Sequence, residues 1–156
     1  MTPRSGIPAR AGMATAAYKL PTRGNVINLR PADSYPFHSS ASGIAYLAFC
    51  SPQKRDQLLE LPRKKLTRFT ITDQADLLAL CDMTKTQGFA CARNTVEEGV
   101  SSIAMPFFTD GSDPAGTISI AVPDLNLTEE HQAMLMQKLR VAIRQLEVAL
   151  TGRNES

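Results

Sequence analysis

Three short runs of strand-forming residues follow one another between residues 89 and 122, and this spacing constrains the fold more than any other feature. The runs are predicted at 89–94, 102–108 and 116–122, separated by connections rich in Gly, Asp and Ser. Such short connections leave no room for a crossover helix, so neighbouring strands are expected to pair antiparallel. Pro106 cannot donate to a ladder and indicates an edge or a bulge. The pattern predicts an antiparallel meander.

A long amphipathic helix is predicted after the meander, from Thr128-Glu129-Glu130 to about Leu150. Its apolar side chains recur at spacings of four, three, four and three, which places them on one stripe; they are Leu135, Leu139, Ala142, Leu146 and Ala149. The further apolar residues Met134, Met136, Val141 and Ile143 widen this stripe. We expect the helix to pack across the sheet, and the wide stripe leaves open that it also meets a partner subunit.

Helices are also predicted before the meander. One begins in the serine-rich segment near residue 39 and ends near Cys50, and a second covers Gln53 to Leu61. A third begins with Thr72 as its N-cap and ends at Gly88 in a left-handed cap. A strand hairpin is predicted earlier, with strands at 13–20 and 26–29 around the turn 21–25. This order indicates an α+β domain with one antiparallel sheet.

The chain of 156 residues suits one domain, which we place at 11–152. Residues 1–10 are expected to be disordered or tag-like, and the polar tail 153–156 to fray. No run of eighteen apolar residues occurs, so we expect no contact with a membrane.

The cysteines Cys50, Cys81 and Cys91 are odd in number and form no C-x-x-C pair, and the chain has only two His. We therefore expect no metal and no cofactor, but reduced thiols in a cytoplasmic protein. Seventeen basic residues face fifteen acidic ones, too even a balance to indicate nucleic acid. The basic cluster Arg63-Lys64-Lys65 with Arg68 could touch phosphate, but a solvated loop is favoured.

Catalytic motifs are missing from the sequence: there is no G-x-S-x-G elbow, no phosphate-binding G-x-x-x-x-G-K-[ST] loop and no H-E-x-x-H. A small hydrolase that uses His38 or a cysteine remains as an alternative, because His38 precedes the serine cluster. We predict no catalytic residue.

Serines in three segments suggest a polar cavity instead. Ser102 and Ser119 lie among apolar residues on predicted neighbouring strands, and Ser42 lies at the start of a predicted helix. Free N–H groups at a helix start, together with hydroxyls aimed at the same space, would suit a small carboxylate or another polar metabolite. The alternative is that these small residues fill tight places between the sheet and a helix.

Residues 36–48 read PFHSSASGIAYLA and resemble the pattern P-x-H-x-[ST]-A-x-G-[KR]-A-x-L-A, which opens the effector-binding domain of IclR-type bacterial transcriptional regulators. Residues 87–90 (QGFA), 98–106 (EGVSSIAMP), 115–120 (AGTISI) and 127–130 (LTEE) resemble its later elements in the same order. The resemblance extends from about residue 11 to residue 150.

This resemblance implies a GAF-like, profilin-like antiparallel sheet with flanking helices and a role in bacterial gene regulation rather than catalysis. It implies a small organic acid effector, bound by Ala41, Ser42, Ser102 and Ser119, with a further contact at Ala121. It also implies self-association as a dimer or tetramer, whose arrangement the effector shifts. DNA would be contacted only through a winged helix-turn-helix, which we do not find in this sequence. The alternative is a ligand-free oligomerisation module.

The sequence departs from the family pattern at three places. Ile44 replaces the usual basic residue after the glycine, and Cys91-Ala92-Arg93 stand where family members often have acids. An acid that often orients the ligand falls on Ala92, and a polar contact is lost at Ala121. These departures suggest a more apolar ligand, or an acid balanced by Arg93.

Overall fold

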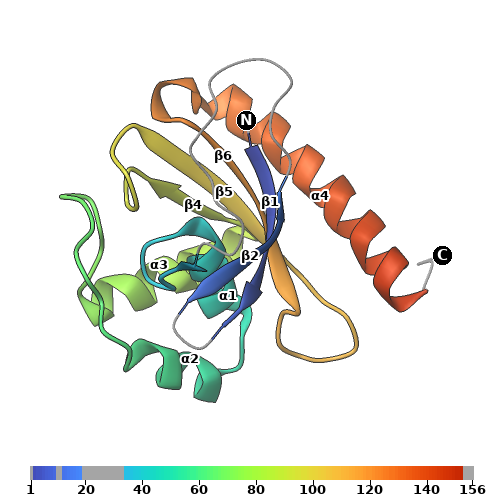
Figure 1. The fold of residues 1–156 in the computed structure, drawn as a ribbon, viewed down its shortest axis with the longest axis horizontal. Helices are drawn as coiled ribbons and strands as arrows, with labels where there is room; N and C mark the ends of the chain where they lie inside the picture. The colour runs from blue at the N-terminus through green and yellow to red at the C-terminus, as the bar shows by residue number, and fades with distance from the viewer. Residues whose placement is uncertain (1, 10–11, 19–33, 153–156) are drawn as a thin grey trace.

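A computed structural model describes residues 2–9, 12–18 and 34–152, which form one antiparallel sheet with helices on both faces (Figure 1). The sheet has six strands in the order β3-β2-β1-β6-β5-β4, and every neighbouring pair is antiparallel. The strands are β1 (Thr2–Pro8), β2 (Met13–Tyr18), β3 (Ser34–Tyr35), β4 (Ala90–Arg93), β5 (Val100–Phe107) and β6 (Gly116–Pro123). The predicted α+β class with a single antiparallel sheet is confirmed.

The meander of β4, β5 and β6 is present as predicted, with bounds that differ by one or two residues. Pro106 lies in β5, an interior strand, at a position that has no pairing partner on β4. Pairing between β4 and β5 ends at Ala90 and Ala104, so β4 does not reach Pro106. The missing N–H of this proline therefore interrupts no ladder with β4.

The N-terminal segment corrects one expectation: residues 2–8 are not disordered but form β1, between β2 and β6. Its Gly, Pro and Arg content is typical of a loop, and the backbone pairing on both sides overrides that local preference. β2 confirms the first strand of the predicted hairpin in part, while the predicted strand 26–29 lies outside the described residues. β2 pairs with β1 and with β3.

The four α-helices in the described part of the chain begin at polar caps. They are α1 (Ala41–Phe49), α2 (Pro52–Leu59), α3 (Gln74–Gln87) and α4 (Glu129–Thr151), with a short 3₁₀ turn at Asp124–Asn126. Asp73, and not Thr72, is the N-cap of α3, since the Asp73 carboxylate accepts from the backbone of Asp76. Gly88 and Gly152 end α3 and α4 with φ of 88° and 68°, in the left-handed region that glycine tolerates.

The two faces of the sheet carry side chains of different size. The face toward α4 holds large residues, among them Ile103, Ile120 and Val122, which pack against the helix. On α4 the buried residues are Leu135, Leu139 and Ile143. The expected stripe is wrong at Ala149, which is exposed. Ile143, which was expected to widen the stripe, is buried and keeps it in phase with 3.6 residues per turn.

The opposite face, toward α1, carries mostly small residues. Ala90, Ala92, Ala104 and Ala121 are buried there, and α1 is buried along almost its whole length. Register places Ser102 opposite Ala121 and Ser119 opposite Ala104, so both serines share this face. Short side chains leave space between the sheet and the start of α1. None of the helices described is long and apolar enough to cross a membrane.

Candidate ligand-binding site

A cavity of about 60 Å³ lies between the start of α1, the sheet and the connection from β4 to β5. The lining residues come from segments that are far apart in the sequence. They are Arg4, Tyr35, Ser40, Ala41, Ser42, Ala92, Thr95, Val96, Glu97, Val100, Ser102 and Ser119.

All four predicted binding residues line this one cavity. Ala41 and Ser42 open α1, while Ser102 lies on β5 and Ser119 on β6. The further contact expected at Ala121 is not among the lining residues, and its side chain is fully buried. The structure thus brings these residues together from three separate segments. Serines that were only scattered over the surface would not share one cavity.

The start of α1 supplies unpaired donors to the cavity. The Ser40 hydroxyl caps the helix by accepting from the Gly43 N–H at 2.9 Å, and the Ser40 carbonyl accepts from Ile44. Ala41 and Ser42 occupy the first helical positions, whose N–H groups have no acceptor within a helix. Together with the positive end of the helix dipole, these groups favour an acceptor or an anion in the cavity.

Arg4 lines the cavity from β1 and was missed by the sequence analysis, which placed it in a disordered start. Its backbone lies opposite Ser119 of β6, and its guanidinium carbon lies 4.9 Å from the centre of the Tyr35 ring. Arg4 belongs to no recognisable motif. Its position follows from strand pairing across more than a hundred residues, which local sequence patterns do not report.

The connection between β4 and β5 forms the rim of the cavity through Thr95, Val96 and Glu97. Thr95 fixes this rim to the start of α1, because its hydroxyl donates to the Ser39 carbonyl at 2.5 Å. Asn94 begins the turn in a left-handed conformation, with φ of 61°, and its side-chain oxygen accepts from the Gly99 N–H. The rim is thus held by specific hydrogen bonds.

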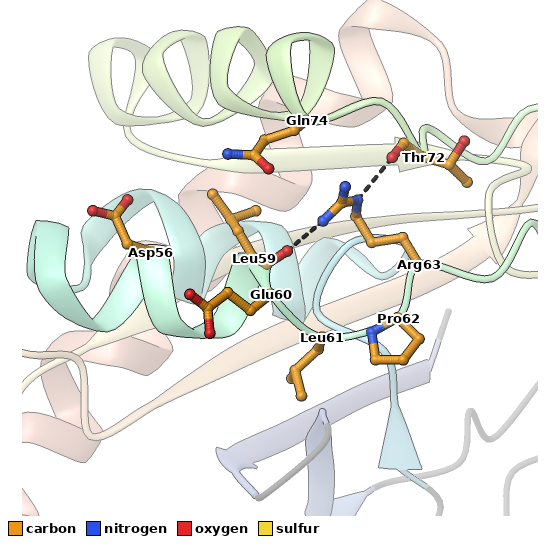
Figure 2. Close-up of a pocket in the computed structure, with 8 residues that line it drawn as sticks. All are labelled: Asp56, Leu59, Glu60, Leu61, Pro62, Arg63, Thr72 and Gln74. Atoms are coloured by element: carbon orange, nitrogen blue, oxygen red, sulfur yellow. Dashed lines mark hydrogen bonds between the residues drawn. The ribbon is translucent and has the colours of Figure 1, made fainter.

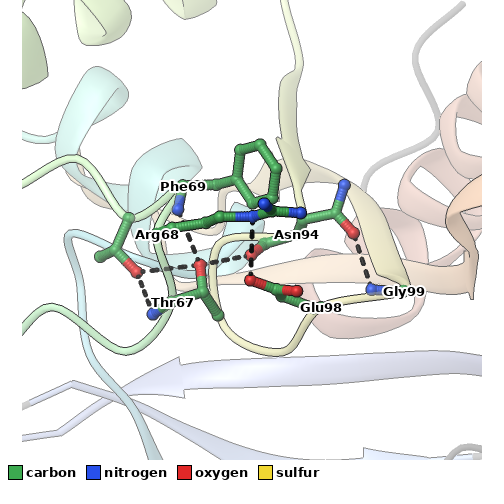
Figure 3. A network of polar contacts seen from close by, with 7 residues as sticks. Thr67, Arg68, Phe69, Asn94, Glu98 and Gly99 are labelled. Carbon is green, nitrogen blue, oxygen red and sulfur yellow. Dashed lines mark hydrogen bonds and ion pairs between the residues drawn. The ribbon is translucent and has the colours of Figure 1, made fainter.

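A second segment, between α2 and α3, is hydrogen-bonded to the same rim (Figure 3). The Thr67 hydroxyl donates to the Asn94 carbonyl at 2.6 Å, and the Thr70 hydroxyl donates to the Thr95 carbonyl at 2.7 Å. An exposed ion pair between Arg68 and Glu98, at 3.2 Å, lies beside them. The two partly buried hydrogen bonds from Thr67 and Thr70 connect the cavity rim to the 60–73 segment.

Arg93, which one interpretation of the sequence set against an acid of the ligand, has structural partners in this fold. It is absent from the cavity lining and forms an ion pair with Asp124 at 3.0 Å, while also donating to the Leu127 carbonyl. Hydrogen bonds from Ser101 and Asn94, together with the Arg93 charge, hold the pKa of the Asp124 carboxyl below its ordinary value. This pair fastens β4 to the turn before α4.

The residues of the hydrolase alternative lie outside the cavity lining. The buried His38 ring makes a hydrogen bond through Nε2 to the Lys64 carbonyl at 2.8 Å. Burial raises the pKa of the Cys50 and Cys81 thiols to about 11, and burial also raises the pKa of Cys91. Protonated thiols are poor nucleophiles at neutral pH. Within the described ranges, no three His, Cys, Asp or Glu side chains are grouped to hold a metal ion.

Arg63 and Arg68 of the basic cluster have structural partners. Arg63 donates to the carbonyl oxygens of Leu59 and Thr72, and so joins the end of α2 to the start of α3 beside a second pocket (Figure 2). The acidic side chains of Asp56 and Glu60 line the same pocket. This arrangement agrees with the loop interpretation rather than with a phosphate-binding surface.

Comparison with known protein families gives a match over most of the chain. The family described as "Bacterial transcriptional regulator IclR C-terminal" matches residues 26–148. Among curated proteins, the HTH-type transcriptional regulator KdgR of Escherichia coli is 30% identical over 116 residues. That alignment covers 74% of this chain and 44% of KdgR, so the chain spans less than half the length of this relative.

Solved structures share the fold. The crystal structure of the C-terminal domain of Escherichia coli KdgR has a TM-score of 0.84 and 25% identity, and covers 96% of this chain and 87% of that one. An IclR homologue from Microbacterium hydrocarbonoxydans, complexed with 4-hydroxybenzoate, has a TM-score of 0.83 and 25% identity. The match covers 96% of this chain and 60% of that chain.

Proposed function

The chain belongs to the C-terminal domain family of IclR-type bacterial transcriptional regulators, and on that premise we propose that it senses a small organic acid. It is a regulator domain and not an enzyme. The acid would bind in the cavity at the start of α1, with Ala41, Ser42, Ser102 and Ser119 as its contacts.

One observation carries this proposal: neutral donors from α1, β5 and β6 converge on one enclosed space. Two free helical N–H groups and three hydroxyls suit the oxygens of a carboxylate. Ala92 adds apolar wall where the family often has an acid, so the rest of the ligand should be apolar. The 4-hydroxybenzoate bound by the Microbacterium relative is an acid of this kind.

The size of the cavity limits what can bind without rearrangement. Its volume of about 60 Å³ is well below the roughly 300–1,000 Å³ that is usual for ligand pockets. We expect compact acids such as pyruvate to fit the cavity as it stands. An aromatic acid would enter only when the rim formed by residues 94–99 moves outward.

Regulation would follow from a difference in affinity between two arrangements of a dimer or tetramer. A ligand shifts such an equilibrium only by as much as it prefers one state. DNA would be contacted through a part of the protein outside this chain, in the cytoplasm. The exposed apolar side chains of Met134, Val141 and Leu150 on α4 support self-association.

Thermal unfolding in the presence of small carboxylates tests the proposal. An acid at one hundred times its Kd should stabilise the domain by about 2.7 kcal/mol and raise its Tm. Ser102→Leu fills the cavity and should abolish this shift. Ser112→Leu is the matched control, because Ser112 is exposed and outside the cavity, and it should respond like the wild type. If no acid raises the Tm, or if Ser102→Leu responds fully, the proposal is wrong.

A further inference from the structure

Arg4 is the cationic side chain in a cavity whose other donors are neutral. Strand register places Arg4 opposite Ser119, and side chains of paired residues stand next to each other on the same face of a sheet. Its guanidinium is stacked on Tyr35, which also lines the cavity. The charge is therefore held at the wall formed by β1 and β6.

The Nε atom of Arg4 is buried and has no hydrogen-bond partner among the described residues. Other buried polar atoms share this property, but none of their residues lines the cavity. Leaving a buried donor unpaired is costly, and more so on a charged group. A ligand acceptor inside the cavity would remove that cost.

The one acidic side chain among the described residues of the cavity lining does not neutralise Arg4 inside the cavity. Glu97 is the acid of the lining, and it is exposed on the rim formed by the β4–β5 connection. Neither of the ion pairs found in the described part of the chain includes Arg4. The positive end of α1 also borders the cavity, so the cavity interior favours a negative charge.

We propose that Arg4 determines the specificity of the cavity for anions, by pairing with the carboxylate of the effector beside the Ser119 hydroxyl. This inference rests on the proposed function of the same cavity and adds the residue that distinguishes an acid from its neutral analogue. The carboxylate then lies between Arg4 and the start of α1, and the apolar part of the effector lies toward Ala92.

Calorimetric titration of acid and amide pairs tests this role. The probes are pyruvate with pyruvamide, benzoate with benzamide, and 4-hydroxybenzoate with 4-hydroxybenzamide. Arg4→Gln should weaken binding of each acid that binds the wild type by about tenfold or more, because a charge-assisted hydrogen bond is lost. The affinity for the amide should change by less than about twofold. Arg144→Gln, at an exposed position of α4, is the control and should leave both affinities unchanged.

Arg4→Lys separates charge from packing, since lysine keeps the charge without the planar fork. The preference of Arg4→Lys for acid over amide should lie between those of the wild type and Arg4→Gln. If Arg4→Gln does not fold, a reduced preference in Arg4→Lys still tests the proposal. Equal weakening of acid and amide, or unchanged acid binding in Arg4→Gln, would overturn the role of Arg4 and leave the binding function intact. A wild type that binds none of the probes would remove both.

Discussion

At the scale of single residues, Gly43 decides how closely the first turn of α1 approaches the preceding segment. A Cβ atom at this position would lie 2.4 Å from the carbonyl oxygen of Phe37 and 2.5 Å from its Cα. These are backbone atoms, which cannot turn aside as a flexible side chain can. Glycine therefore allows the start of α1, and with it Ala41 and Ser42, to take up its position at the cavity.

We predict that Gly43→Ala destabilises the domain by about 1–3 kcal/mol, because the helix must move to relieve the overlap. Urea denaturation measures this change in the free energy of unfolding. Gly111→Ala is the matched control, since a Cβ at Gly111 would meet nothing closer than 3.9 Å. A Gly43→Ala protein as stable as Gly111→Ala would show that the close approach has no energetic weight.

Arg4 shows why part of the site could not be predicted at this scale. Ser42, Ser102 and Ser119 stand out locally, as hydroxyls at a helix start or among strand residues, and the family resemblance aligned them. Arg4 sits in a segment with the composition of a loop, and pairing with Ser119 on β6 gives it its place. Long-range pairing of this kind leaves no trace in neighbouring residues.

At the scale of elements, the β4–β5 connection and the 60–73 segment act as one unit over the cavity. Thr70 is buried and central to it: its oxygen accepts from Leu66 and Thr67, and its hydroxyl donates to Thr95. The rim can therefore move outward only if these hydrogen bonds are exchanged for others. This links the opening of the cavity to the loop before α3.

Thr70→Val keeps the shape of the side chain and removes these hydrogen bonds. We predict a loss of about 1–3 kcal/mol in the free energy of unfolding, and faster hydrogen exchange across residues 94–99. Exchange measured by mass spectrometry reports the second effect. Thr86→Val is the control, because the Thr86 hydroxyl bonds only within the exposed face of α3. If exchange in 94–99 is equally slow in both variants, Thr70 does not hold the rim.

The elements that the sequence predicted well are those with local signals. The Ser40 region before α1, Gly88 after α3 and Thr128 before α4 are caps, and each marks its helix end from within a few residues. Adjacent Thr72 and Asp73 can both cap a helix, so the local sequence does not distinguish them, and the predicted cap at Thr72 is wrong. β1 was missed because backbone pairing, rather than its own residues, makes it a strand.

At the scale of the whole molecule, the sheet separates two interiors with different roles. Large side chains of the sheet pack against α4. On the other face, small side chains of the sheet pack against α1 and leave room for a ligand at the start of that helix. Large and small residues alternate along β5 and β6, so the same two strands present large side chains to one face of the sheet and small side chains to the other. Both faces contribute a packed core, and the α1 face also contains the candidate site.

The central claim is that this α1-facing cavity binds a small acid, and an NMR titration of backbone amides tests it most directly. On addition of pyruvate, benzoate or 4-hydroxybenzoate, we predict that the largest shifts occur at Ala41, Ser42, Ser102 and Ser119 for at least one acid, saturating with a single Kd. Shifts confined to α4, or no saturable shift with any of the three, would contradict the account.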